Sequence, residues 1–168
     1  ISAAWIGLYV AVAYLASIVA SLASGAAVGR WGSIRVSQAA LGLCAAGLVL
    51  CAVPAAWAIA LGAVLVGFGY GPITPASSHL LAPTTPAHRM SLVFSIKQTG
   101  VPLGGALAGA IVPPLQVVAG WQPALLAVAA ACVACALVAR RLRAGFDADR
   151  DPAHRLGLGN ILAPVGLV

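Results

Sequence analysis

Lys97 is a cation that lies well inside a long apolar stretch of the sequence. If that stretch crosses a membrane, a charge near the bilayer centre costs roughly 2.5 to 3.5 kcal/mol, so something must offset the cost. We predict that its ammonium faces a polar cavity and attracts an anionic solute, helped by the Gln98 amide and the Thr99 hydroxyl. The alternative is that the long side chain reaches back to the lipid head groups.

Glycine and proline interrupt this stretch and the apolar stretch before it. Proline removes a backbone donor and clashes with the preceding turn, so we predict breaks in helical hydrogen bonding near Pro72, Pro75 and Pro102. Unpaired backbone groups are tolerated in lipid only beside protein or a water-filled cavity, so a pair of interrupted spans indicates a transport site. The predicted gating residues are Gly71, Pro72, Pro75, Gly100, Pro102, Gly104 and Gly105. The predicted solute-binding residues are Lys97, Gln98, Thr99, Tyr70 and Thr74.

The same glycines also suit a simpler role. Gly67 with Gly71, and Gly100 with Gly104, are GxxxG pairs, which let two helices approach closely in a membrane. Under this alternative the two stretches are kinked helices that only pack. A non-transporting structural membrane subunit is therefore a second hypothesis beside the transporter.

The other reactive side chains form no catalytic or metal-binding pattern. Cys132 and Cys135 form a CxxC in an apolar run without a nearby histidine or acid, so we expect the four cysteines to be packing residues. All three acidic residues lie between Asp147 and Asp151. A membrane-embedded enzyme would need an acid, a metal cluster or an activated nucleophile at membrane depth. We therefore expect no enzyme, no metal and no cofactor.

The composition indicates an integral membrane protein. Hydrophobic residues make up 62% of the chain and charged residues 7%, whereas soluble domains carry about 25% charged residues. The net charge of +6 would suggest nucleic acid on a soluble protein. Here the arginines lie between apolar runs, as positive charge does in the cytoplasmic loops of membrane proteins. We expect membrane lipid around the chain and no nucleic acid partner.

The lengths of the uncharged runs predict the number of spans, since a bilayer core needs roughly 20 helical residues. The run 1–29 is one helix, and the runs 36–78 and 98–139 are two helices each, with turns near Pro54 and Gly120. The predicted fold is all-α: a polytopic transmembrane helix bundle with five full spans plus the start of a sixth. Basic loops at 30–35, 79–89 and 140–155 alternate with uncharged turns, which places the basic loops in the cytoplasm. The chain starts without Met and ends in an apolar run, so we expect a fragment.

The turn after the first span resembles a signature of the major facilitator superfamily transporters, found there between the second and third helices. The residues that carry it are Gly25, Arg30, Gly32 and Arg35. Gly29 stands where the family has Asp, and Ser33 with Ile34 replaces a basic pair. The stretch 100–105 is similar to the Gly/Pro motif of the family's fifth helix, with its proline displaced by one. The family's membrane arginine in the preceding helix would fall near Ala63.

The resemblance implies helices two to six over residues 1–142, the central cytoplasmic loop over 143–155, and the start of the next helix over 156–168. It implies secondary active transport of a small solute by alternating access, by a monomer when complete with its C-terminal half. The stretch 94–100 is similar to family permeases for cyanate or small carboxylates, which agrees with an anionic solute. A drug-type efflux antiporter of the same family is the alternative. We expect the bacterial plasma (inner) membrane as the location.

Overall fold

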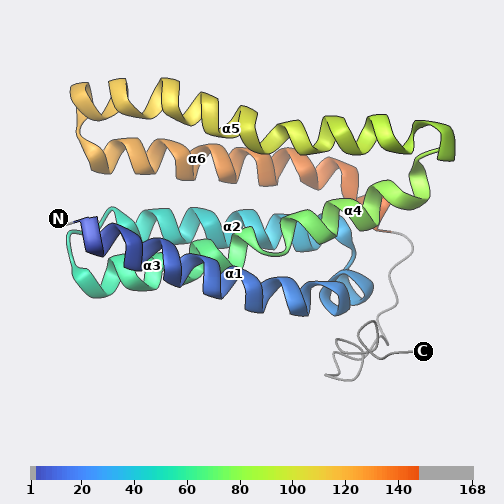
Figure 1. Ribbon diagram of the computed structural model, residues 1–168, viewed down its shortest axis with the longest axis horizontal. Helices are drawn as coiled ribbons and strands as arrows, with labels where there is room; N and C mark the ends of the chain where they lie inside the picture. Colours follow the sequence, from blue (N-terminus) through green and yellow to red (C-terminus); the bar gives the residue numbers. More distant parts are fainter. Residues whose placement is uncertain (1–2, 148–168) are drawn as a thin grey trace.

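The computed structural model describes residues 3–147, and the chain is helical through almost all of them (Figure 1). Five helical segments are long and apolar enough to cross a membrane, as predicted, and α3 and α4 together form the third of them. The start of a sixth span and the loop beyond residue 147 lie outside the described residues. The elements are α1 (Ala3–Trp31), α2 (Ser33–Cys51), α3 (Ala56–Tyr70), α4 (Ile73–Thr84), the 3-10 turn η1 (Ala87–Arg89), α5 (Met90–Ala119), α6 (Trp121–Ala139), the 3-10 turn η2 (Arg140–Leu142) and α7 (Arg143–Phe146).

Single glycines make two of the reversals between spans. Gly32 (φ 90°) joins α1 to α2, and Gly120 (φ 91°) joins α5 to α6. Both lie in the left-handed region that residues with a Cβ rarely adopt. The prediction of longer basic loops is therefore wrong at two places. Arg30 and Arg35 lie in helix ends beside a one-residue turn, and His79 lies within α4, because helical hydrogen bonding continues almost to the turn.

The basic turns gather at one end of the bundle, here called the basic end. The α1–α2 turn, the α4–α5 turn and the end of α6 all lie there, at the right in Figure 1, while the uncharged turns lie at the other end. The alternation of charge predicted from the sequence is thus seen in space. Its cytoplasmic assignment rests on the tendency of basic loops to remain on that side.

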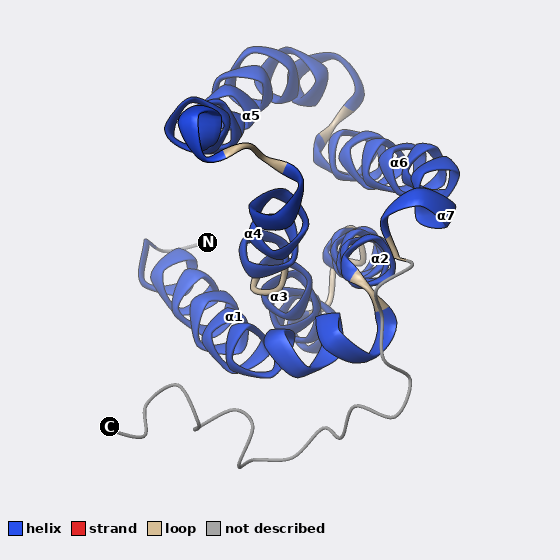
Figure 2. Ribbon diagram, turned by 90° about the vertical axis from the view of Figure 1, so that its right-hand side faces the viewer, coloured by secondary structure: helices blue, strands red, loops and turns tan. Residues whose placement is uncertain are grey.

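Small residues allow the helices to pack. Helix α3 lies between α1 and α2, α2 packs on α6, and α5 packs on α6 (Figures 1 and 2). The buried positions are mostly alanine, serine and glycine, whereas large side chains such as Leu15, Leu22 and Val117 are exposed. This is the pattern expected where lipid, rather than water, surrounds the bundle. One polar contact also joins α2 to α6, because the Gln38 amide donates to the Ala136 carbonyl over 2.8 Å.

Cys44 and Cys51 fill space between α2 and α3. A Cβ at Gly69 would lie 2.5 Å from the Cys44 sulfur, and a Cβ at Gly62 would lie 2.5 Å from the Cys51 sulfur. All four cysteines are free thiols. The contacts of Cys44 and Cys51 confirm the packing role predicted for them.

The two predicted helix breaks have different outcomes. The break before α4 is present, since α3 ends at Tyr70 and α4 begins at Ile73. It centres on Gly71 and Pro72, because Pro75 lies in the first turn of α4, where a missing N–H costs no helical bond. The predicted break near Pro102 is wrong: α5 is one helix from Met90 to Ala119. A single lost donor is tolerated in a membrane helix when the rest of the turn can adjust.

Candidate functional site

Lys97 reaches from α5 across to α4. Its Nζ donates to the Ser78 hydroxyl over 2.6 Å and to the Thr74 carbonyl over 3.2 Å. The Phe94 ring lies one turn before Lys97 on α5, with 5.5 Å between the ammonium nitrogen and the ring centroid. The ammonium is thus held by two oxygens of one helix and an aromatic ring of its own helix. Such a ring attracts a cation through its negative face.

The first turn of α4 concentrates hydrogen bonds on one carbonyl. The Thr74 carbonyl accepts from the Ser77 hydroxyl over 2.9 Å and from the Ser78 hydroxyl over 3.0 Å, besides Lys97. Ser78 therefore accepts from Lys97 and donates to Thr74. This arrangement follows directly after the Gly71–Pro72 break.

Ser78 is a residue that sequence reasoning missed. It lies four positions after Thr74, and residues four apart share one face of a helix. The spacing therefore predicts that a side chain close to Thr74 on α4 also lies close to Ser78.

The other predicted solute-binding residues lie apart from this cluster. Within residues 3–147, no hydrogen bond joins Gln98, Thr99 or Tyr70 to Lys97. The Thr99 hydroxyl donates to the Ile96 carbonyl of its own helix over 2.6 Å. Tyr70 is half exposed at the end of α3, and Gln98 is exposed. The structure thus brings together Lys97 and Thr74, the latter through its carbonyl.

The charge of Lys97 meets no carboxylate in the part of the chain that the structure describes. Asp147 is the single acid between residues 3 and 147, and it lies at the start of α2. Within the described residues the hydrogen-bond partners of Lys97 are the neutral oxygens of Ser78 and Thr74, so no protein carboxylate there balances its charge.

The predicted gating glycines of α5 face open space. A Cβ placed on Gly100, Gly104 or Gly105 would have no atom within 4 Å. Pro102 lies among them and is also exposed. Gly71, in contrast, packs so closely on α1 that an added Cβ would overlap the Ser17 carbonyl oxygen.

The predicted signature at the α1–α2 turn holds a carboxylate that the sequence places far away. The Asp147 side chain accepts from the backbone N–H of Ile34 over 2.8 Å and from that of Arg35 over 3.2 Å. The family pattern has its acid at position 29, which is Gly29 here. The Arg30 guanidinium lies 5.8 Å from the centroid of the Trp31 ring. Gly25 lies on an exposed part of α1 with open space around it.

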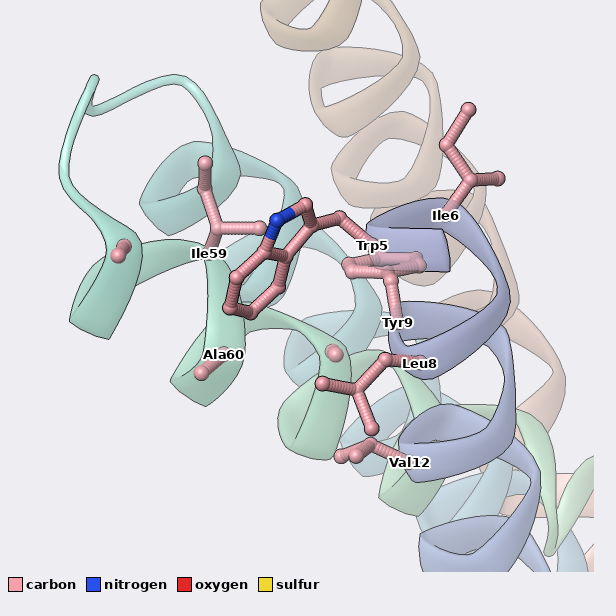
Figure 3. A pocket seen from close by; sticks show the side chains of 9 residues that line it. Trp5, Ile6, Leu8, Tyr9, Val12, Ile59 and Ala60 are labelled. Atoms are coloured by element: carbon pink, nitrogen blue, oxygen red, sulfur yellow. The ribbon is translucent and has the colours of Figure 1, made fainter. Parts of the chain in front are cut away.

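A cavity of about 640 Å³ opens between α1 and α3 at the end opposite to the basic end. The Trp5 indole projects from α1 toward Ile59 of α3, and Ala63 lies in the same lining (Figure 3). The Tyr9 hydroxyl lies 3.6 Å from the Cys51 sulfur. No charged side chain lines this Trp5 cavity among the described residues, so it suits apolar rather than ionic groups.

The helices and their apolar surfaces define a polytopic α-helical membrane protein, embedded in the bilayer by five spans. The chain belongs to the Major Facilitator Superfamily, whose family model matches residues 1–165. Members of this family are transporters of small-molecule solutes and are not enzymes. No curated protein and no solved structure gave a significant match to the chain.

Proposed function

We propose that the protein is a secondary active transporter of a small anionic solute, with the Lys97 ammonium as the contact for the anion. The observation that supports this most is a half-buried cation, inside an apolar span, whose hydrogen-bond partners among the described residues are neutral. A cation in that setting is costly, and an anion that binds beside it lowers the cost. Ser78 and Thr74 supply the oxygens that hold the ammonium while no solute is bound.

The proposed solute carries one negative charge. A single ammonium beside one hydroxyl matches a monoanion such as a carboxylate or cyanate. A dianion would carry a second negative charge, and the described contacts of Lys97 include no second cation to balance it. The Ser78 hydroxyl can turn to donate to the solute's oxygen once the ammonium moves toward the anion, because hydroxyl rotors adapt to their partners. The same serine can therefore serve both the empty and the occupied site.

The break between α3 and α4 is the proposed moving part. Gly71 and Pro72 lie directly before the turn that holds Lys97, so a change of angle there shifts Thr74 and Ser78 relative to α5. Interrupted helices beside a midplane site are a common arrangement in secondary transporters. The gating role of the α5 residues Gly100, Pro102, Gly104 and Gly105 would then be to present an open helix face to the solute path. We further propose that the complete protein acts as a monomer in the bacterial inner membrane.

The test uses the full-length protein in proteoliposomes and measures transport currents on a solid-supported membrane. Acetate, lactate and cyanate serve as monoanions and sulfate as a dianion. We expect Lys97→Ala to abolish the monoanion currents and Ser78→Ala to raise the half-saturating concentration. Ser77→Ala is the matched control, because Ser77 bonds to the same carbonyl without touching Lys97. Unchanged currents in a well-folded Lys97→Ala protein would remove this residue from the site.

The Trp5 cavity favours the alternative function, a drug-type efflux antiporter. Its apolar lining suits a lipophilic compound. Lys97 does not line this cavity, so its positive charge would repel a bound lipophilic cation only weakly. The test compares the accumulation of a lipophilic cation dye in cells with and without the full-length protein. Two results together would favour this alternative over anion transport: the protein lowers dye accumulation, and Ala60→Trp, which fills the Trp5 cavity, returns it to the level of cells without the protein.

A further inference from the structure

We propose that the Asp147 carboxylate is a clasp that fastens the segment after α6 to the first turn of α2, and so holds the basic ends of these helices together as one body. The residues of the clasp are distinct from those proposed to bind the solute. The effect of the clasp on transport rests on the proposed function, whereas its structural role does not.

The first amides of a helix lack partners within the helix, and α2 receives them from Asp147. The carboxylate accepts from Ile34 and Arg35, which lie 113 and 112 positions away in the sequence. It also places a negative charge at the positive end of the helix dipole. Asp147 is only 6% exposed, so water competes little for these bonds. Bonds between an ionised carboxylate and backbone amides are among the stronger hydrogen bonds in proteins.

Gly32 makes the clasp possible in two ways. Its positive φ turns the chain so that the amides of the following residues point at Asp147. It also leaves the space that the carboxylate occupies, because a Cβ at this position would lie 2.5 Å from the Asp147 Cγ and Oδ1. As the residue before α2, Gly32 has no side chain that could cap the helix itself. The cap must therefore come from elsewhere, and Asp147 supplies it.

The same turn of α2 also holds α4. The Ser33 hydroxyl and the His79 Nδ1 lie 3.2 Å apart, which joins α2 to the second half of α4. A small pocket of about 210 Å³ lies at this junction, between His79 and Phe146. The first turn of α2 therefore contacts the segment after α6 on one side and α4 on the other.

The arrangement has a consequence for alternating access. Asp147 fastens α7 to α2, in addition to the chain connection of α7 to α6. A displacement of α7 would then act on α2 and α6 together, and on α4 through the contact between Ser33 and His79. Loss of the clasp should lower the maximal transport rate, because α4 belongs to this group and carries Thr74 and Ser78, the partners of Lys97.

Hydrogen exchange of the full-length protein in nanodiscs tests the structural part. We expect Asp147→Ala to speed the exchange of a peptide that covers residues 33–37 by about tenfold or more, since the loss of a bond of roughly 1.5–3 kcal/mol corresponds to that change. Asp147→Asn, which keeps an acceptor but not the charge, should give a smaller increase and protects the test against misfolding of the alanine variant. Gly32→Ala should act like Asp147→Ala, because its Cβ would displace the carboxylate.

Asp149→Asn is the matched control, since it removes the same charge two positions further along the chain. It should leave the exchange of residues 33–37 unchanged. The clasp is overturned if Asp147→Ala leaves that exchange unaltered, or if Asp149→Asn speeds it equally. Faster exchange with normal transport kinetics would retain the clasp and refute its role in the transport cycle. Because exchange is measured without solute, this result is independent of whether Lys97 binds an anion.

Discussion

Two glycine pairs have the same spacing and opposite surroundings: Gly67 with Gly71 at the end of α3, and Gly100 with Gly104 in α5. Gly67 and Gly71 lie against α1 so closely that an added Cβ would overlap the carbonyl oxygens of Ala13 and Ser17. Gly100 and Gly104 have the same GxxxG spacing, yet an added Cβ there would meet nothing within 4 Å. One glycine pair has been used to bring two helices together. The other leaves an open face on the helix that carries Lys97.

This contrast separates the two roles that the sequence left open for these residues. Close packing is the role of the glycines in α3, where they let α1 and α2 approach from two sides. For α5 the described helices provide no such partner, and its face stays available for a solute path or for a further helix. The spacing alone predicts that a helix can be approached closely. It does not predict what approaches it.

The largest expected effect is a loss of stability when a side chain is added to the closely packed glycine pair. Gly67→Ala should destabilise the protein by about 1–3 kcal/mol, because the new Cβ would meet the Ala13 carbonyl oxygen and the Ala16 Cβ, and backbone cannot move as a side chain can. Thermal unfolding in detergent measures the change. Gly104→Ala is the matched control and should leave the melting temperature nearly unchanged. Equal losses in both variants would show that the two helix faces do not differ in packing.

The fold could be predicted from the sequence because it depends on one-dimensional quantities. The length of each uncharged run fixes how many times it can cross a bilayer, and this predicted the turns near Pro54 and Gly120. The break at Pro102 was predicted wrongly because the loss of one backbone donor can be absorbed by its neighbours. A proline pattern shows where a helix is weakened. The packing around it decides whether the helix ends.

The two prolines sharpen the comparison at the level of the backbone. Pro72→Ala supplies an N–H at the existing break and should favour a continuous α3–α4 helix, so we expect the transport rate to fall several-fold while binding of the solute persists. Pro102→Ala lies in a helix that is already continuous and should restore a hydrogen bond worth about 0.5–1.5 kcal/mol with little change in rate. Transport currents and thermal unfolding measure both. The reverse order of effects on rate would place the moving part in α5.

The site could be predicted less well than the fold, and the reason is distance along the chain. Lys97 and Thr74, which the structure places in contact, could be singled out because each is polar in an apolar segment, and Ser78 could have been inferred from its position one turn after Thr74. Asp147 could not, because nothing near it in sequence indicates that it caps a helix more than a hundred residues earlier. The missing acid at Gly29 showed that the turn differs from the family pattern. It did not show which residue would supply the carboxylate.

The smallest expected effect is on the chemical labelling of the open face of α5, where substitutions should leave the stability of the protein unchanged. In a variant without native cysteines, Gly104→Cys should react with a water-soluble maleimide if the α5 face lines an aqueous path, whereas Ala58→Cys, at a position 0% exposed, should not. A solute that binds at Lys97 should slow the labelling of Gly104→Cys, since two turns of α5 separate the positions. Labelling by a lipid-soluble maleimide alone would assign this face to lipid. In that case the open glycines would be an unfilled packing surface, and the solute path would have to run along α4.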